Sequence, residues 1–412
     1  MTASPPPERI GHYENPFLAV EWHRDPPGGT TCEPLRFPTP DASLSEGWLY
    51  CRGGERTAAL LVHPRANFAR HYAVPGLLDA GIAVLTQNTR FRGNDAAVVH
   101  ETALLDVAAA TTFLRDRYDR VVFVGNSGGA SLLTFYIEQA GLAPADRLAR
   151  TPAGDRVDLA QTTMPPPDAL VLLAAHPGEG HYLLHAVDPS VVVEGDPLSC
   201  DPALDMYDPA NGFAEPEAES RYDPEFVARY RAAQRERIER LDDVAQGRVE
   251  RRRAARARWR DSGSTGDRRA SIATDFMVVY RTDADLRFTD LRIDPSDRTY
   301  GTIWGRRPDW SNYGAVGFAR LVTPESWLST WSGLSSHAEI ARTGAGVRLP
   351  ALHVAYRGDH VIFPSDASLV CDSLAGEDLT TLTFPGDHYG WPAGTGRDPA
   401  VAAVARWIRD RE

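Results

Sequence analysis

The most informative segment of this 412-residue chain reads Val121-Val122-Phe123-Val124-Gly125-Asn126-Ser127-Gly128-Gly129-Ala130. It contains the pattern G-x-S-x-G, placed where a short apolar run ends. The run 121–124 has the length of a buried parallel strand, and the residues up to Gly141 have the pattern of a helix. A serine on a tight turn between a strand and a helix projects its hydroxyl from the sheet, so we predict Ser127 to be a nucleophile.

The glycines around Ser127 fit the same interpretation. Gly125 and Gly129 lack the Cβ atoms that would clash where the strand and the helix pack closely. The N–H of Gly128 lies at the N-terminus of the new helix, where it would point at an oxyanion. The alternative is a glycine-rich turn that carries an incidental serine.

Strand-like and helix-like segments alternate along much of the chain. Strands are predicted at 57–63, 82–86, 121–124, 169–175, 351–356 and 379–384, and helices at 95–117 and, with Asp398 as N-cap and Pro399 at the first helical position, near the C-terminus. Residues 47–52 and 57–63 flank Gly53-Gly54, which suggests a hairpin. The alternation predicts an α/β protein with a mostly parallel sheet covered by helices on both faces.

Two later segments can supply partners for Ser127. The first, Gly358-Asp359-His360, follows the strand-like run 351–356, and the second, Asp387-His388, follows the run 379–384. Both lie after the carboxyl ends of strands, which is where an open α/β sheet binds its ligands.

With these residues in place, the chain resembles the α/β-hydrolase fold family over about residues 45–180 and 347–412. That family has the order nucleophile, acid, histidine. The resemblance implies that Asp359 is the acid and that His388, 29 positions beyond it, is the base. His360 stays open as another base, and Asp387 and Glu179 stay open as other acids.

The resemblance also implies a second oxyanion donor in the turn after residues 57–63, which here reads His63-Pro64-Arg65-Ala66. Many relatives carry His-Gly at this turn, and Pro64 has no N–H to donate. We therefore predict the backbone N–H of Arg65 as the donor, with Ala66 as the second choice. His63 is interpreted as a structural residue that ties the loop down.

A large insertion separates Ser127 from Asp359 by 232 positions. We predict a first part of the core at 1–180, a mainly helical cap at 181–346 and a second part of the core at 347–412. The cap contains a long arginine-rich helix over about 223–260, beginning at Asp223-Pro224, and an aromatic segment over 300–331. Interleaved acidic residues favour an ion-paired, solvated helix over an anion-binding one. The aromatic residues either line a substrate pocket or pack within the cap.

The charge and composition exclude several functions. All 44 basic residues are arginines, so the chain can form no lysine Schiff base and contains no Walker-type G-K-[ST]. A net charge of −12 disfavours binding to nucleic acid or to anionic membranes. No cofactor is predicted. The cluster His176, Glu179, His181 and His185 has the residue types of a metal site, but a pocket-lining role is favoured and no metal is predicted.

These observations predict a serine hydrolase that cleaves a carboxylic ester of a small apolar or aromatic substrate. The elbow Gly-Asn-Ser also resembles that of C–C bond hydrolases of ring-cleavage products, and thioester, lactone and amide substrates stay open. A non-catalytic binding protein on the same fold is the alternative from another class. The N-terminal residues have no signal-peptide pattern and the four cysteines form no C-x-x-C pair, so we expect a cytoplasmic protein. A small-molecule substrate is the expected partner, and a homodimer is left open.

Overall fold

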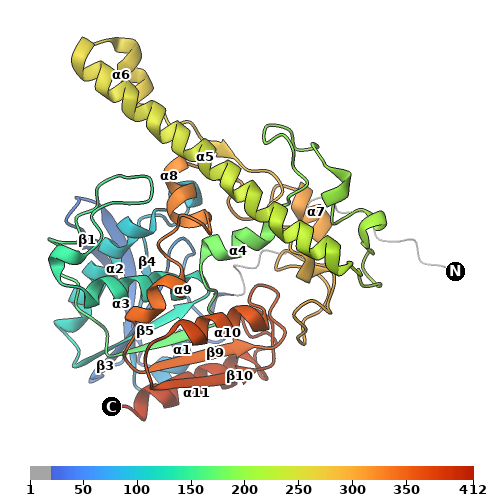
Figure 1. Cartoon of the computed structure of the whole chain (residues 1–412). Coiled ribbons are helices and arrows are strands. Elements are labelled where there is room, and N and C mark those ends of the chain that lie inside the picture. Colours follow the sequence, from blue (N-terminus) through green and yellow to red (C-terminus); the bar gives the residue numbers. More distant parts are fainter. Residues whose placement is uncertain (1–19) are drawn as a thin grey trace.

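A computed structural model describes residues 20–412, which are built around one central sheet (Figure 1). Its eight strands lie in the order β1-β2-β4-β3-β5-β6-β9-β10. Their bounds are β1 Thr31–Pro38, β2 Leu44–Cys51, β3 Thr57–His63, β4 Ala83–Asn88, β5 Arg120–Asn126, β6 Ala169–Leu173, β9 Ala351–Tyr356 and β10 Leu379–Phe384. Strand β2 runs antiparallel to β1 and β4, and every pairing from β4 to β10 is parallel. The predicted mostly parallel α/β sheet is therefore confirmed.

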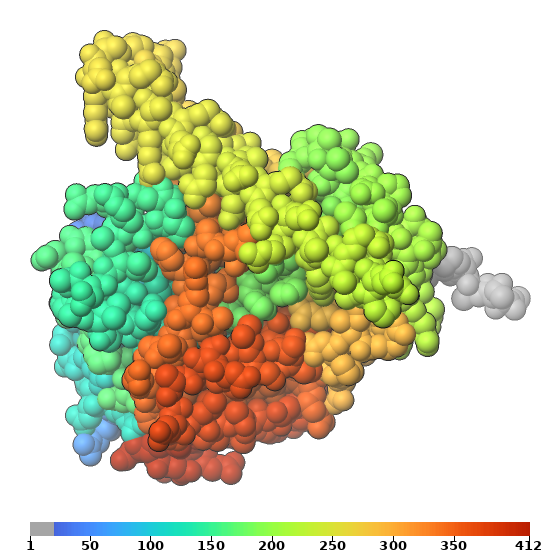
Figure 2. Space-filling view, viewed as in Figure 1, coloured from blue at the N-terminus to red at the C-terminus, as the bar shows by residue number. Residues whose placement is uncertain are grey.

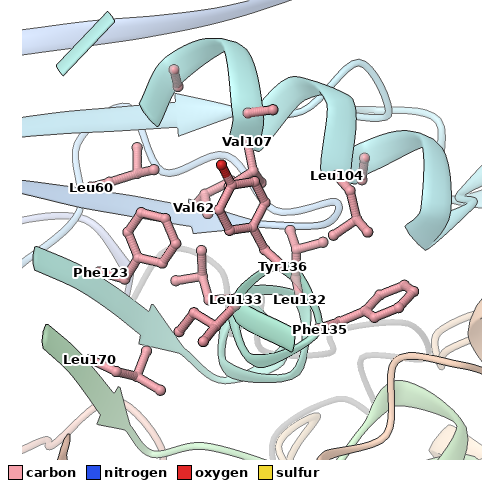
Figure 3. Close-up of a cluster of buried hydrophobic side chains, with 14 of the residues drawn as sticks. Leu60, Val62, Leu104, Val107, Phe123, Leu132, Leu133, Phe135, Tyr136 and Leu170 are labelled. Carbon is pink, nitrogen blue, oxygen red and sulfur yellow. The ribbon is translucent and has the colours of Figure 1, made fainter. Parts of the chain in front are cut away.

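Helices cover both faces of the sheet, as the apolar runs require. The helices are α1 Val74–Asp79, α2 His100–Arg115, α3 Gly128–Gly141, α10 Pro364–Ser373 and α11 Arg397–Arg409. On one face, Leu60 and Phe123 of the sheet pack against Leu104 of α2 and Leu132 of α3 (Figure 3). On the other face, α1 and α11 pack against the alternate residues of the same strands. Because both faces are covered, every residue of β3 is buried, which explains its continuous apolar run.

Several predicted elements appear with nearly the predicted bounds. The strands at 351–356 and 379–384 are confirmed at the same residues. The long arginine-rich helix is α5, Pro224–Ser262, and the Asp223 side chain accepts a hydrogen bond from the Glu225 N–H at 2.8 Å. The helix predicted over 95–117 begins as a separate 3-10 turn, Asp95–Ala97, before α2.

Two local predictions are wrong. Residues 47–52 and 57–63 do not form a hairpin, because β2 pairs with β1 and β4 while β3 lies between β4 and β5. β3 is buried on both faces and takes an interior position, whereas β2 alternates in burial. The last helix begins at Arg397 instead of Pro399, and Gly396 takes the N-cap position. The buried Arg397 fixes this earlier start, because its Nε donates to the Tyr389 carbonyl at 2.8 Å.

The insertion leaves the sheet after β6 and returns before β9, the neighbouring strand. Its elements are α4 Glu179–Ala186, α5, α6 Thr265–Ile272, β7 Met277–Val278, α7 Pro308–Tyr313, β8 Leu321–Val322, α8 Pro324–Ser326, a π-helical turn Trp327–Trp331 and α9 Ile340–Thr343. The 3-10 turns of the insertion lie at Pro202–Leu204, Pro209–Asn211, Leu286–Phe288 and Gly344–Gly346, and another, Pro144–Asp146, lies between α3 and β6. The boundary predicted at residue 180 falls inside α4. The far end of α5 projects beyond the body together with α6 (Figures 1 and 2).

Within residues 20–412, no helix combines the length and the apolar character needed to cross a membrane.

Candidate active site

Ser127 occupies a sharp turn between β5 and α3. Its backbone has φ 55° and ψ −126°, a region that residues other than glycine rarely adopt. The Ser127 N–H donates to the Leu173 carbonyl at 3.1 Å, which ties the turn to the end of β6. A Cβ on Gly129 would lie 2.2 Å from the Val62 carbonyl oxygen, so only glycine allows α3 to start this close to β3. The strand–turn–helix arrangement expected around Ser127 is present.

The structure brings Ser127, His388 and Asp359 together. His388 Nε2 lies 3.0 Å from Ser127 Oγ, and His388 Nδ1 lies 2.8 Å from Asp359 Oδ2. The other carboxylate oxygen, Asp359 Oδ1, accepts the N–H groups of Val361 and Ile362 at 2.7 and 3.0 Å. Since the carboxylate accepts from Nδ1–H, Nε2 is left as the acceptor for the serine hydroxyl.

The alternative residues take part in other local contacts within the described part of the chain. His360 Nε2 lies 3.2 Å from Thr299 Oγ1 and not at the serine. Asp387 accepts the N–H groups of Tyr389 and Trp391, both at 2.9 Å, and thereby shapes the turn after β10. Glu179 accepts from Arg65 Nε at 3.2 Å.

Four buried polar side chains gather beside Gly128. A Cβ on Gly128 would lie 2.5 Å from Glu179 Oε1, 3.0 Å from His63 Nε2 and 3.2 Å from His176 Nε2. The Arg65 Nε donates to Glu179 Oε1 at 3.2 Å. Each of these residues was singled out in the sequence, but the contact between the Arg65 side chain and Glu179 was not predicted. Their position was the only sign of a shared site, because each lies at or just after the carboxyl end of a strand.

The charges in this cluster are balanced. Burial would raise the pKa of Glu179, but the nearby Arg65 guanidinium and His176 outweigh it and hold that pKa at about 2. Burial lowers the pKa of His176 to about 4, so this imidazole is neutral at pH 7. Arg65 also donates to Asp95 at 3.2 Å, and its guanidinium stacks on Phe318 at 4.4 Å from the ring centre. The insertion thus contacts the loop that follows β3.

The predicted second oxyanion donors, the N–H groups of Arg65 and Ala66, both donate to His63 Nδ1, at 3.2 and 3.0 Å. Burial and the neighbouring Arg65 charge hold the pKa of His63 well below its usual range. A neutral imidazole whose Nδ1 accepts hydrogen bonds carries its proton on Nε2. The His63 Nε2–H therefore lies on the side of Gly128 on which Glu179 Oε1 also lies, 4.0 Å from Nε2.

The other two histidines of the predicted cluster lie apart from the elbow. His181 Nε2 contacts Asp366 Oδ1 at 3.1 Å, and the His185 Nδ1–H donates to the His181 carbonyl at 3.1 Å. Among residues 20–412, no group of three or more His, Cys, Asp or Glu side chains is arranged to hold a metal ion.

A cavity of about 350 Å³ lies beside Asp359. Its wall is mostly apolar and includes Ala174, Ala175, His353, Ala355, Ile362 and Phe363. The aromatic residues of the insertion divide among several environments. Trp327 is buried in the insertion, where its Nε1 donates to Asp242 at 2.7 Å, whereas Trp310 is exposed.

Comparison with known proteins gives matches in structure only. No protein-family model matches the chain, and no curated protein sequence matches it. Its structure is similar to the esterase domain of a Rhodothermus marinus protein (12% identity, TM-score 0.44, covering 92% of this chain and 98% of that chain). It is also similar to an esterase of Pyrococcus furiosus (10%, TM-score 0.43, 95% and 99%) and to a hypothetical protein of Pseudomonas aeruginosa (13%, TM-score 0.47, 95% and 97%).

The assignment of the fold rests on the order of its parts. Ser127 follows β5 at a sharp turn, Asp359 follows β9 and His388 follows β10, all on a mostly parallel sheet. Because this is the order and the setting of nucleophile, acid and histidine in one known architecture, the chain has the α/β-hydrolase fold, here with a long-helix insertion between β6 and β9.

Proposed function

We propose that this protein is a serine hydrolase that cleaves carboxylic esters through an acyl-enzyme. The supporting observation is the chain of contacts from Ser127 Oγ to His388 Nε2 at 3.0 Å and from His388 Nδ1 to Asp359 Oδ2 at 2.8 Å. It offers one nucleophile, one base and one acid in the arrangement used for acyl transfer.

In this mechanism Ser127 Oγ attacks the ester carbonyl carbon while His388 Nε2 takes the hydroxyl proton. Asp359 stabilises the imidazolium and keeps the ring oriented. The tetrahedral intermediate then collapses, the bond to the alcohol oxygen breaks, and His388 returns the proton to the leaving alcohol. A water molecule, deprotonated by His388, attacks the acyl-enzyme and releases the acid.

The oxyanion needs two donors, and we assign them to the Gly128 N–H and the His63 Nε2–H. The first lies at the start of α3, beside the nucleophile. The second is a neutral imidazole N–H whose nitrogen lies 3.0 Å from the Cβ position of Gly128. Glu179 Oε1 lies 4.0 Å from the same nitrogen, and the ion pair with Arg65 offsets its charge. In this assignment the Arg65 N–H keeps its bond to His63 Nδ1 and orients the ring.

For the substrate we propose an ester with a small apolar or aromatic group. The Phe318 ring of the insertion, whose centre lies 4.4 Å from the guanidinium carbon of Arg65 beside the elbow, supports this choice. So does Arg65, whose charge is balanced by Glu179 and Asp95 and is therefore less suited to hold a substrate carboxylate.

The test is labelling with a fluorophosphonate probe, followed by assays on p-nitrophenyl esters of graded chain length. Wild type and Ser131→Ala, a matched control one helical turn further on, are expected to react with the probe and to hydrolyse esters. Ser127→Ala is expected to lose both activities. Equal labelling or turnover by Ser127→Ala would contradict the proposal. Turnover of vinylogous diketones without turnover of esters would assign the site to C–C bond hydrolysis instead.

A further inference from the structure

The two ends of α5 carry opposite charges. Residues 248–278, which include α6 and are called the basic arm here, hold nine arginines and four acidic residues. Residues 192–223, called the acidic end, hold nine acidic residues and one arginine. A 39-residue helix is about 58 Å long. The insertion is therefore a long, charge-separated rod in a chain whose net charge is −12.

The acidic end is fixed to the first half of α5. The Arg237 guanidinium donates to Glu194 Oε2 at 2.7 Å, and Asp223 is the N-cap of the helix. The basic arm is at the opposite end of α5. Figure 2 shows the far part of the arm, in yellow, projecting from the body, and the acidic end, in green, at the other end of the helix. At the base of the arm, Arg253 pairs with Asp155 at 3.2 Å.

The basic arm has little packing of its own. Of residues 250–276, only Ala255 and Ser271 are fully buried. A helix gains most of its stability from packing an apolar face against other elements, so an extension with so few buried residues has surface available for a contact.

Part of the charge at each end has no ion-pair partner among the described residues. In the arm, Arg258 pairs with Asp267 at 2.9 Å, but Arg256 and Arg260 form no ion pair within residues 20–412. In the acidic end, Glu217 pairs with Arg306 at 3.0 Å, while Glu215 and Glu219 form none within that same range. The prediction of an ion-paired arginine-rich helix therefore holds for some arginines of the arm, such as Arg258, and not for Arg256 and Arg260 among the described residues.

Each end also exposes large apolar side chains. In the arm, Ile272 is 66% exposed and Phe276 is 49% exposed. In the acidic end, Leu198 is 75% exposed and Val192 is 64% exposed. Exposed apolar side chains within a charged rim are typical of protein–protein contacts.

We propose that two copies of this chain associate in an antiparallel manner, with the basic arm of each copy on the acidic end of the other. Two-fold symmetry makes both contacts identical, because each copy supplies one arm and one acidic end. The charges then attract at both contacts and the exposed apolar side chains become covered. A nucleic acid would account for the arm alone and would leave the acidic end without a role, so the second copy is the partner that both ends fit.

The experiment is sedimentation velocity of the full chain and of two charge-reversed variants. Arg256→Glu with Arg260→Glu changes the arm, and Glu215→Arg with Glu219→Arg changes the acidic end. Each variant alone is expected to be monomeric, because the substitutions reduce the net charge of the arm from +5 to +1, or that of the acidic end from −8 to −4, and put like charges at the substituted positions of both contacts. An equal mixture of the two variants is expected to recover the dimer, because the substituted positions then face opposite charges.

The controls separate this pairing from general charge effects and from misfolding. Arg406→Glu with Arg409→Glu, on α11, makes the same change in charge and is expected to leave the dimer intact. Each variant's melting temperature reports whether it is folded. The wild-type dissociation constant is expected to rise about tenfold or more between about 0.05 M and about 0.5 M NaCl, because salt screens the contacts.

Three results would overturn the proposal. One is a wild-type chain that stays monomeric at low salt at every protein concentration measured. That result would overturn the proposal even if the arm bound DNA. Another is a dimer that survives both reversals. The third is a mixture of the two variants that stays monomeric.

Discussion

His63 has two nitrogen atoms with separate tasks. Its Nδ1 accepts the N–H groups of Arg65 and Ala66 and so shapes the loop after β3. Its Nε2 faces the space beside Gly128, where the proposed oxyanion forms. Because the two atoms are distinct, two substitutions can separate the structural task from the catalytic one.

We expect His63→Asn to keep the loop and lose the oxyanion donor, since the Asn Oδ1 can replace Nδ1 as acceptor but no atom replaces Nε2. His63→Gln places an amide N–H near the position of Nε2. If His63 donates in the transition state, kcat for ester hydrolysis falls about 10²–10³-fold in His63→Asn, with KM little changed, and falls less in His63→Gln.

The measurement is steady-state kinetics on a p-nitrophenyl ester, with the melting temperature as a check on the loop. Equal kcat values for the two variants would show that Nε2 has no such role.

The sequence predicted that Ser127, Asp359 and His388 would come together, because each follows a strand end and lies in a short turn motif, and the three side chains are in contact. It did not predict the Arg65–Glu179 pair. These residues are 114 positions apart, and they meet only because β3, β5 and β6 are adjacent in the sheet. Contacts of this kind depend on strand order, which local sequence patterns do not encode.

Among the elements, α5 was predicted nearly at its bounds, β1 was not predicted, and the pairing of β2 was predicted wrongly. Asp223-Pro224 marks the start of α5, and Gly263 ends it with φ 67°. By contrast, Gly53-Gly54 indicated a hairpin of β2 with β3, but β2 pairs with β4, which lies between β2 and β3 in the sheet. Short glycine turns permit a hairpin without requiring one, and the burial of the neighbouring strands decides the pairing.

Substitution of one glycine inside α5 is expected to stabilise the protein. Gly247 lies in the helix interior, where glycine is unfavourable, and a Cβ there would meet only the end of the Arg251 side chain, at 3.5 Å. Gly247→Ala is therefore expected to stabilise the protein by about 0.5–1 kcal/mol. The measurement is the free energy of unfolding in urea.

Gly129→Ala is the matched contrast, because its Cβ would lie 2.2 Å from the Val62 carbonyl oxygen. It should destabilise the protein. A Gly247→Ala variant that is less stable than wild type would contradict the prediction for α5.

Across the whole molecule, many histidines are buried and uncharged. Burial lowers the pKa of His71 to about 3 and those of His176, His185 and His353 to about 4. In the unfolded chain the histidine pKa is about 6.5. Between these values the unfolded chain binds more protons than the folded one, so acid favours unfolding.

The protein is therefore expected to lose stability as the pH falls from about 6.5 towards 4. Asp283 opposes this trend, because burial raises its pKa to about 6 and the folded state gains a proton there. The measurement is the free energy of unfolding at a series of pH values.

His353 offers a specific control for this pH dependence. Its Nε2 is buried without a hydrogen-bond partner among the described residues, at the wall of the cavity. His353→Leu should remove about 3 kcal/mol of the loss between pH 7 and pH 4. A pH profile identical to that of wild type would show that this imidazole does not contribute.

The place where the insertion joins the sheet has a practical consequence. Strands β6 and β9 are hydrogen-bonded neighbours, with Leu170 opposite Ala351, although residues 174–350 separate them along the chain. Because the two strands are parallel, the segment leaves the carboxyl end of β6 at one edge of the sheet and returns to the amino end of β9 at the other edge. Its two ends are therefore held by the sheet itself, about one strand length apart. Changing the length of such a loop costs little chain entropy. A designer could thus exchange the outer part of the insertion, from α5 to β8, and keep the crossover to β9, in which Ala338, Ile340 and Val347 pack in the core of the sheet.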